Sequence, residues 1–248
     1  MHLLHIGPIE PVKTLLIVAG IVFAVYWFGL RGKGGECGTP GAVACPNAEL
    51  EEGIGVTLNA ADVCPTAGYL CYQRASFQVM RWPLDKGKLR IHVPRPEFLN
   101  GETWEMVRDA VVEGFREWED RPFPLVFDTA KRASGSPDLT IAWVQAQVDR
   151  GQVGHVGTRG MPDGKRLRYS ADNLTIVVLH ELSPAALDRI RATASHELGH
   201  ALGLVHSDSA SDLMYHQYPR GGGRVIPTAR DFLTLDALYS LPNGAMVR

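Results

Sequence analysis

The sequence predicts an α+β fold in which a few helices pack on a mixed, twisted β-sheet. Short runs rich in β-branched and aromatic residues have the composition of strands; they cover residues 87–93, 125–127, 139–144 and 174–179. Two longer segments, 104–118 and 183–201, carry apolar residues at helical spacing. A third helical pattern follows residue 228 and predicts a C-terminal helix.

The first predicted helix has an aromatic-rich apolar stripe. Its members are Trp104, Val107, Val111, Phe115 and Trp118. A side-chain oxygen of Asn100 or Thr103 could accept a hydrogen bond from the first turn and cap the helix. A stripe of this kind is more typical of a core than of a ligand site, so we expect the helix to pack on the sheet.

The strands are bounded by residues that do not continue a sheet. Pro94 and Pro96 end the first strand because proline has no N–H to donate. Between the strands at 139–144 and 174–179 lies Gly151–Asp172, a long glycine-rich and polar stretch. His155 within it is expected to be a surface or hydrogen-bonded histidine.

The two later helices have clear start signals. Ser183 and Pro184 predict an N-cap and a first-turn residue, and Thr228 with Asp231 predicts a capping box for the last helix. The stripe expected to face the sheet is Leu187, Ile190, Ala194, Leu198 and Ala201. The residues expected to close the core from the last helix are Leu233, Ala237 and Leu238.

The second helix also carries a histidine motif. His196 and His200 are one turn apart and project from the same face. Two neutral imidazoles at this spacing can hold one zinc ion. Gly203 can leave the helix with a positive φ, which would turn the chain sharply and bring His206 back as a third ligand.

Three protein ligands leave the fourth tetrahedral position to water, which is typical of a catalytic zinc site. Glu197 stands beside the first ligand, where it can take a proton from that water. Met214 follows eight residues after His206 and is expected to form an apolar floor under the metal without ligating it. A bare H-E-x-x-H also occurs in ordinary helices, but the added glycine, histidine and methionine make the pattern specific.

These residues carry a family resemblance. The run His196–His206, followed by Ser207, Asp208 and Asp212–Tyr215, resembles the metzincin zinc endopeptidases and, among them, the matrixins. Segments around the first strand and the last helix are similar to the same family, so the resemblance spans about residues 76–242. Only the zinc motif and the turn around Met214, called the Met-turn in this family, are specific within that span.

One position separates the chain from two other metzincin branches. Astacins and serralysins place a metal-proximal tyrosine two residues after the Met-turn methionine. Here that place is taken by His216, and the tyrosine is Tyr215. This departure argues against those branches.

The resemblance implies a metzincin, zincin-like catalytic domain whose second helix is the active-site helix. It implies one catalytic Zn²⁺ on His196, His200 and His206, with Glu197 as general base, and a protein or peptide as substrate. In this family the loop matching Pro219–Pro227 walls the pocket for the side chain after the cleaved bond.

Matrixins carry further metals in the region that matches Gly151–Asp172. The spaced His and Asp set that a structural zinc needs is not found in this sequence, so we predict no second zinc. Asp163, Asp172 and Asn173 could hold calcium through oxygen ligands, although no loop motif supports a calcium site.

Length and charge bound the organisation of the chain. Its 248 residues suffice for one domain with a core plus extra segments. A net charge of −2 implies no basic surface for nucleic acid. We divide the chain into a short N-terminal segment, a transmembrane anchor or signal, a linker with a cysteine-tied segment, and the catalytic domain, at residues 1–13, 14–30, 31–75 and 76–248. The oligomeric state is left open.

Thr14–Leu30 is 17 residues long and contains no charge. As a helix it would measure about 25 Å, which approaches the thickness of a hydrocarbon core. It predicts either an uncleaved membrane anchor or an export signal. The small-residue sequence Ala42–Ala44 lies more than ten residues beyond it, which favours the anchor. Either reading places the catalytic domain outside the cytoplasm, membrane-anchored or secreted, although the flanking charges leave the orientation undetermined.

The four cysteines precede the zinc motif and suggest disulfides in an oxidising compartment. Proximity favours Cys37–Cys45 and Cys64–Cys71, although four cysteines allow three connectivities and four reduced thiols are an alternative. The sequence around Cys37 partly matches the matrixin cysteine switch. Glu36 and Gly41 stand where that motif has arginine and aspartate, which argues against a switch.

Two other functions compete with proteolysis. The chain could be a membrane-tethered binding module that keeps the fold without catalysis, or a hydrolase acting on something other than peptide. The intact Glu197 and the full ligand set argue against an inactive module, because such a module needs neither.

Overall fold

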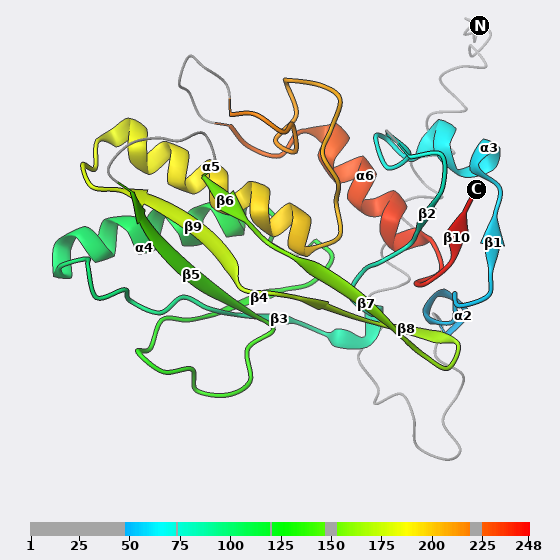
Figure 1. The fold of residues 1–248 in the computed structure, drawn as a ribbon, viewed down its shortest axis with the longest axis horizontal. Coiled ribbons are helices and arrows are strands. Elements are labelled where there is room, and N and C mark those ends of the chain that lie inside the picture. The colour runs from blue at the N-terminus through cyan, green and yellow to red at the C-terminus, as the bar shows by residue number, and fades with distance from the viewer. Residues whose placement is uncertain (1–47, 73, 120, 147–152, 219–224) are drawn as a thin grey trace, which may run out of the picture. The chain divides into compact units, whose positions relative to one another are not determined.

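The computed structural model describes residues 48–248, apart from residues 73, 120, 147–152 and 219–224. One compact unit covers Asn47–Arg248 (Figure 1). The predicted anchor Thr14–Leu30, the Cys37–Cys45 pair and part of the Pro219–Pro227 loop lie outside the described residues. Within the described part of the chain, no helix combines the length and the apolar composition that crossing a bilayer requires.

A five-stranded mixed sheet forms the centre of the unit. Its strands, in spatial order, are β4 (Leu125–Asp128), β3 (Leu89–His92), β5 (Leu139–Ala146), β9 (Leu174–Leu179) and β6 (Gly154–His155). The first four are parallel to their neighbours, whereas β6 runs antiparallel to β9 and forms the edge. The four predicted strands are therefore confirmed, and the α+β fold with a mixed sheet is confirmed as well.

Two long helices pack against each other on one face of the sheet, α4 (Gly101–Arg116) and α5 (Pro184–Ala201) (Figure 1). The Asn100 side chain caps α4 by accepting from the Thr103 N–H at 3.0 Å, and Ser183 caps α5 by accepting from Ala186. The predicted stripe of α5 faces inward: Leu187 is partly buried, and Ile190, Ala194, Leu198 and Ala201 are buried.

Buried indoles tie these helices to the rest of the core. The Trp118 Nε1–H, just after α4, donates to the Ser195 carbonyl of α5 at 2.8 Å. The Trp82 Nε1–H donates to the Ala201 carbonyl at 2.9 Å. Because a buried N–H needs a partner, each indole fixes a particular turn of α5 as well as filling space.

The C-terminal helix α6 (Ala229–Ser240) begins with the predicted capping box, formed by Thr228 and Asp231. The predicted core face was partly wrong, because Leu233 is 49% exposed. The helix instead buries Leu235 and Leu238, which lie on the same face as the buried Asp231.

The stretch Gly151–Asp172 contains more regular structure than its composition suggests. After the edge strand β6 it forms a two-stranded antiparallel hairpin, β7 (Thr158–Asp163) and β8 (Arg166–Ala171). Only Leu167 and Tyr169 of β8 are buried, in the alternating pattern of a half-exposed strand.

The segment before residue 76 belongs to the same folded unit. It contains two short helices, one strand and one 3₁₀ helix, and a second 3₁₀ helix follows residue 76. Its strand β1 joins two others in a second sheet of order β1–β10–β2. The bounds are α2 (Ala48–Glu51), β1 (Thr57–Leu58), α3 (Ala60–Val63), η1 (Cys64–Thr66), β2 (Phe77–Gln78), η2 (Leu84–Lys86) and β10 (Met246–Val247). The sequence placed the domain boundary at residue 76, whereas the compact unit begins at Asn47.

A buried ion pair attaches this segment to the domain. Arg81 is fully buried, and its Nη1 lies 3.0 Å from Glu51 Oε1. Its other guanidinium nitrogen donates to the Leu50 and Leu241 carbonyls at 2.9 and 3.1 Å. The same Glu51 oxygen accepts from the Leu84 N–H at 2.9 Å, so the charges and donors are mutually satisfied.

Replacing Glu51 by alanine should strongly destabilise the protein. The change leaves a buried guanidinium without its carboxylate, and breaking a buried pair in this way costs about 3–5 kcal/mol. Urea unfolding of the variant and the parent measures this difference. The matched control is Asp163→Ala, which removes an exposed pair with Arg168 and should cost about 0–1 kcal/mol. Equal unfolding midpoints for the two variants would contradict the role given to Glu51.

Candidate active site

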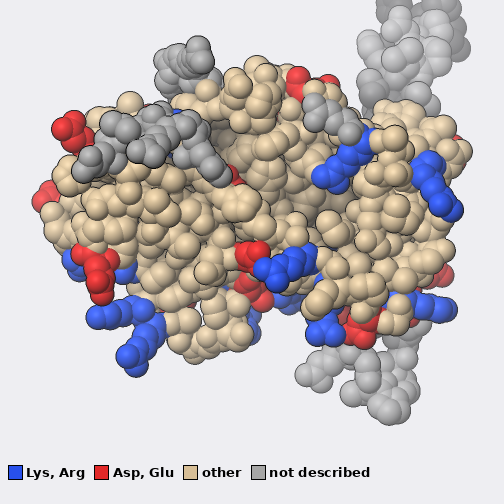
Figure 2. Space-filling model, in the orientation of Figure 1, with Lys and Arg blue, Asp and Glu red and all other residues tan. Residues whose placement is uncertain are grey.

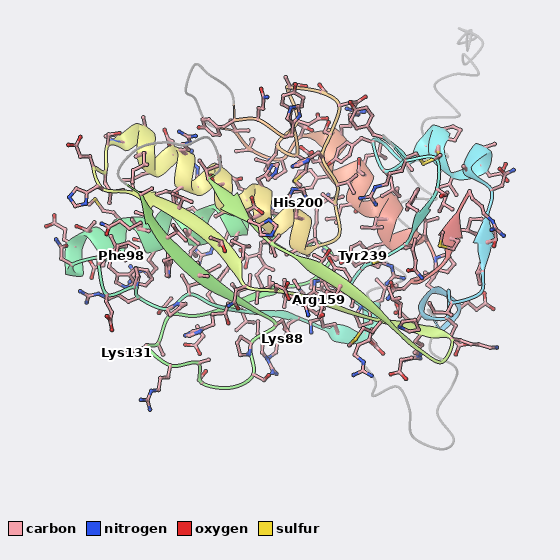
Figure 3. The ribbon with its side chains drawn as sticks, in the orientation of Figure 1. Lys88, Phe98, Lys131, Arg159, His200 and Tyr239 are labelled. Atoms are coloured by element: carbon pink, nitrogen blue, oxygen red, sulfur yellow. A yellow bond between two sulfur atoms is a disulfide. The ribbon has the colours of Figure 1, made fainter. Side chains whose placement is uncertain are left out.

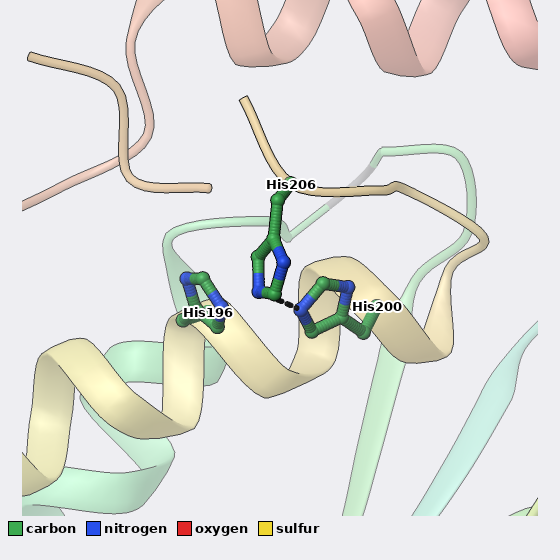
Figure 4. A group of neighbouring side chains, drawn as sticks. All are labelled: His196, His200 and His206. Carbon is green, nitrogen blue, oxygen red and sulfur yellow. Dashed lines mark hydrogen bonds between the residues drawn. The ribbon is translucent and has the colours of Figure 1, made fainter. Parts of the chain in front are cut away.

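The carboxyl-terminal half of α5 presents two histidines one turn apart. His196 and His200 both face the loop that follows the helix, and Figure 3 places His200 near the end of α5. The helix ends at Ala201, and Gly203 takes the positive φ of 107° that the sequence predicted. The chain then reverses, so that His206 returns above the helix (Figure 4).

The three imidazole rings converge on one point. The ring centroids lie 4.7 Å apart for His196 and His200, 4.7 Å for His200 and His206, and 5.4 Å for His196 and His206. One potential ligand nitrogen from each ring lies within 4.8 Å of the others. The Nε2 atoms of His200 and His206 lie 3.2 Å apart (Figure 4).

The far side of two rings is fixed by backbone carbonyls. His196 Nδ1 lies 2.8 Å from the Leu213 oxygen, and His200 Nδ1 lies 2.8 Å from the Leu204 oxygen. A carbonyl oxygen only accepts, so each Nδ1 carries the hydrogen and each Nε2 keeps its lone pair. The lone pairs therefore point into the site, which is the arrangement that orients histidines on a metal.

The donor set fits a zinc ion. Burial lowers the pKa of His200 to about 3, and burial also lowers the pKa of His196 and His206. The rings are therefore neutral, which is the form that binds metals. Two nitrogens bound to tetrahedral zinc at about 2.0–2.1 Å lie about 3.3 Å apart, close to the 3.2 Å between His200 and His206.

Gly203 meets a steric requirement as well as a conformational one. A Cβ at this position would lie 2.6 Å from the Met80 carbonyl oxygen. The Gly203 N–H also donates to the His200 carbonyl at 2.9 Å, which closes the end of the helix. The turn that delivers His206 thus depends on the absence of a side chain.

Glu197 lies on the same helix and lines the same cleft. Only 6% of its surface is exposed. The edge strand β6 covers it so closely that a Cβ at Gly154 would lie 2.7 Å from the Glu197 side chain. This burial raises the pKa of the Glu197 carboxyl to about 7. Such a group can both accept and return a proton near neutral pH.

Hydrogen bonds on two sides fix the turn around Met214, which follows His206 in the chain. Met214 is fully buried, and its carbonyl accepts from the Ser207 N–H at 2.8 Å. The Asp231 carboxylate, at the start of α6, accepts from the Leu213 N–H at 3.0 Å and from the Met214 N–H at 3.4 Å. The Met-turn predicted from the sequence is therefore fixed on both of its edges.

A comparison with protein families bears on the chemistry of this site. A model of the matrixin peptidase family matches residues 100–240, which include both long helices and the whole histidine motif. The chain belongs to the matrixin family. No curated protein matches the chain. Since matrixins are zinc-dependent peptidases, the converging histidines of this matrixin are consistent with one Zn²⁺.

Two histidines of this matrixin also line the cleft, although the sequence did not assign them to the site. The cleft measures about 530 Å³ and includes His155 and His216. The His216 ring centroid lies 6.2 Å from that of His206. His155 is exposed, as expected, and comes from the edge strand β6. Neither residue belongs to a spaced motif, so only the position of His216 after Met214 could have pointed to it.

Of the three residues that could hold calcium, Asp163 is not brought together with Asp172 and Asn173 in this matrixin. Asp163 pairs with Arg166 at one end of the β7–β8 hairpin, while Asp172 follows the pair at the other end. Five strand residues separate these ends, which is about 17 Å. Asp172 accepts from the Arg159 guanidinium at 2.7 and 2.9 Å, so a cation from the protein already occupies its oxygens.

The charge on the face drawn in Figure 2 shows no strong bias. On the face in Figure 2, Lys and Arg side chains lie among Asp and Glu, and most of the central area carries neither. The described residues on this face therefore offer a mixed surface, in line with the net charge of −2.

Alanine at position 203 would have to adopt a positive φ, at a strain of about 1–3 kcal/mol. Relief of this strain would move His206, so Gly203→Ala should weaken zinc binding by roughly 10–100-fold. Competition with a chromogenic chelator measures the affinity. Gly87→Ala is the matched control, since Gly87 also has a positive φ, of 75°, but nothing within 4 Å of the added Cβ. A Gly203→Ala protein that binds zinc as tightly as Gly87→Ala would disprove the role given to this turn.

Proposed function

We propose that this matrixin is a zinc-dependent endopeptidase. His196, His200 and His206 would hold the ion, and Glu197 would act as general base. The observation that carries the proposal is the convergence of three neutral imidazoles and one buried carboxyl in a single cleft. The family match supports the same class of activity.

The protein groups divide the chemistry between them. A bound zinc ion would polarise the scissile carbonyl and lower the pKa of the attacking water. Glu197 would accept the proton of that water and pass it to the leaving amine. Its raised pKa suits both transfers, because a carboxyl with a pKa of about 7 can take up a proton and release it again at neutral pH.

The edge of the sheet offers a place for the substrate. Strand β6 stands at the end of the strand order, and Val153–Val156 line the cleft beside Glu197. An extended peptide could pair with this edge through main-chain hydrogen bonds, which would carry its scissile bond past the histidines. This mode favours unfolded or extended protein segments as substrates.

Removal of the base tests the assignment directly. Glu197→Ala should lower kcat by about 10²–10⁴-fold, the usual contribution of a general base, while zinc content by elemental analysis stays at that of the parent. Cleavage of casein, and its inhibition by a hydroxamate, measures the activity. Glu105→Ala changes an exposed glutamate of α4 and should leave both quantities unchanged.

Two outcomes would contradict parts of this proposal. Unchanged cleavage by Glu197→Ala would show that another group is the base. A parent protein that binds zinc but cleaves no protein, peptide or library substrate would favour the tethered binding module over the peptidase.

We also propose that Thr14–Leu30 anchors the chain in a membrane and that the folded unit Asn47–Arg248, which includes the catalytic domain, acts outside the cytoplasm. The Cys64–Cys71 disulfide supports an oxidising compartment. After expression of the full chain in cells, the protein should stay with membranes during alkaline extraction, and its N-terminus should precede residue 14. A mature N-terminus beyond residue 30 would show instead that the segment is a cleaved signal.

A further inference from the structure

Tyr69 connects a distant part of the chain to the metal histidines. It is 1% exposed and lies within the short loop closed by the Cys64–Cys71 disulfide. Its phenol donates to Asp231 Oδ1 at 2.8 Å, across 162 residues of sequence. The proposed mechanism makes no use of this buried phenol.

Asp231 is the centre of the connection. Besides the Tyr69 phenol, it accepts from the N–H of Leu213 at 3.0 Å and of Thr228 at 2.7 Å. The carbonyl of the same Leu213 accepts from His196 Nδ1 at 2.8 Å. A continuous route therefore runs from Tyr69 through Asp231 and Leu213 to His196.

We propose that Tyr69 is a positioning residue of the metal centre, which holds the Asp231 carboxylate so that the Leu213 peptide keeps His196 aimed at the ion. This inference rests on the proposed function, because it assumes that His196 binds the metal. It assigns to the disulfide-closed segment a part in the site that the sequence did not give it.

The two carboxylate oxygens of Asp231 depend on Tyr69 unequally. Oδ2 accepts from Leu213 and Thr228 at 3.0 Å or less. Oδ1 has the Tyr69 phenol at 2.8 Å, and its other donor, the Met214 N–H, is distant at 3.4 Å. Without the phenol, Oδ1 keeps one long bond in a buried place, so the carboxylate gains by rotating toward a better donor. Such a rotation would move the Leu213 peptide.

The phenol is itself held firmly. The Tyr69 N–H donates to Thr234 Oγ1 of α6 at 3.3 Å, and the Arg230 guanidinium lies 5.3 Å from the ring centroid. Burial and the nearby Asp231 carboxylate raise the pKa of the Tyr69 phenol well above its usual value. The group therefore remains a protonated donor throughout the neutral range.

The route acts on one histidine more than on the others. His200 Nδ1 bonds to Leu204, only four residues away in the turn that ends its own helix. His196 Nδ1 instead bonds to Leu213, whose position depends on the Met-turn and on α6. Loss of the phenol should consequently disturb the His196 side of the site and leave the His200 side in place.

The test compares two tyrosine-to-phenylalanine variants of the full chain. Tyr69→Phe removes the phenol on Asp231, and Tyr239→Phe removes a buried phenol that donates to the Leu202 carbonyl at 3.1 Å, outside the route. Figure 3 labels Tyr239, which lies near the end of α6. Each variant removes one buried phenol hydroxyl and keeps its ring, so a merely structural effect should be no smaller in Tyr239→Phe than in Tyr69→Phe.

Two readouts separate positioning from stability. The zinc dissociation constant, measured by chelator competition, should rise about 10–100-fold for Tyr69→Phe, as for other groups that orient a metal ligand. The visible absorption spectrum of the Co²⁺-substituted protein should also change, because it reports the ligand geometry. Tyr239→Phe should match the parent in both readouts.

Each result decides a different point. If Tyr69→Phe matches Tyr239→Phe in affinity and spectrum, the positioning role is overturned. If the parent binds neither zinc nor cobalt, the proposed function fails before Tyr69 is tested. If Tyr69→Phe does not fold, Asp231→Asn interrupts the same route, and a folded Asp231→Asn protein with parental zinc affinity and spectrum overturns the inference.

Discussion

The site depends on holding three imidazole rings close together, with one potential ligand nitrogen of each within 4.8 Å of the others. Two Nε2 atoms lie 3.2 Å apart, a distance at which bare lone pairs repel unless a proton or a cation lies between them. The protein maintains this arrangement through bonds on the opposite side of the rings, from His196 to the Leu213 carbonyl and from His200 to the Leu204 carbonyl. A divalent cation bound between the two nitrogens would remove this repulsion.

Burial acts on the acidic and basic groups of the cleft in opposite directions. It raises the pKa of Glu197 and lowers the pKa of the three histidines, so in each case it favours the neutral form. The protein groups alone therefore contribute little charge, and a divalent ion would be the largest charge in the cleft. Strand β6 is central to this effect, since it covers Glu197 and also provides the edge proposed for the substrate.

Local geometry explains which features the sequence could predict. The spacing of His196 and His200, the positive φ of Gly203 and the capping box of α6 depend only on neighbouring residues, and the structure has each of them. The Leu233 prediction was wrong because periodicity counts apolar residues, whereas α6 turns the polar Asp231 inward. A buried polar residue of this kind is recognisable only when its partners are known.

Contacts between residues far apart in the sequence explain the features that could not be predicted. The contacts of Glu51 with Arg81 and of Tyr69 with Asp231 join segments 30 and 162 residues apart, and neither leaves a spaced pattern in the sequence. The β7–β8 hairpin was not predicted because only one of its strands alternates cleanly between buried and exposed residues. Such long-range polar contacts have no period in the sequence. The domain boundary predicted from composition therefore falls at residue 76, near the first predicted strand, whereas the folded unit begins at Asn47.

The start of α6 shows how one group can meet several local needs at once. A helix N-terminus has unpaired N–H groups, and the Asp231 carboxylate pairs with the Thr228 N–H within its capping box. The same carboxylate also accepts from the Leu213 N–H in the Met-turn. Since both bonds end on the same oxygen, Oδ2, a shift that improves one of them changes the other. One carboxylate thus joins the cap of α6 to the Met-turn beneath the histidines, so the two cannot move independently without loss of a hydrogen bond.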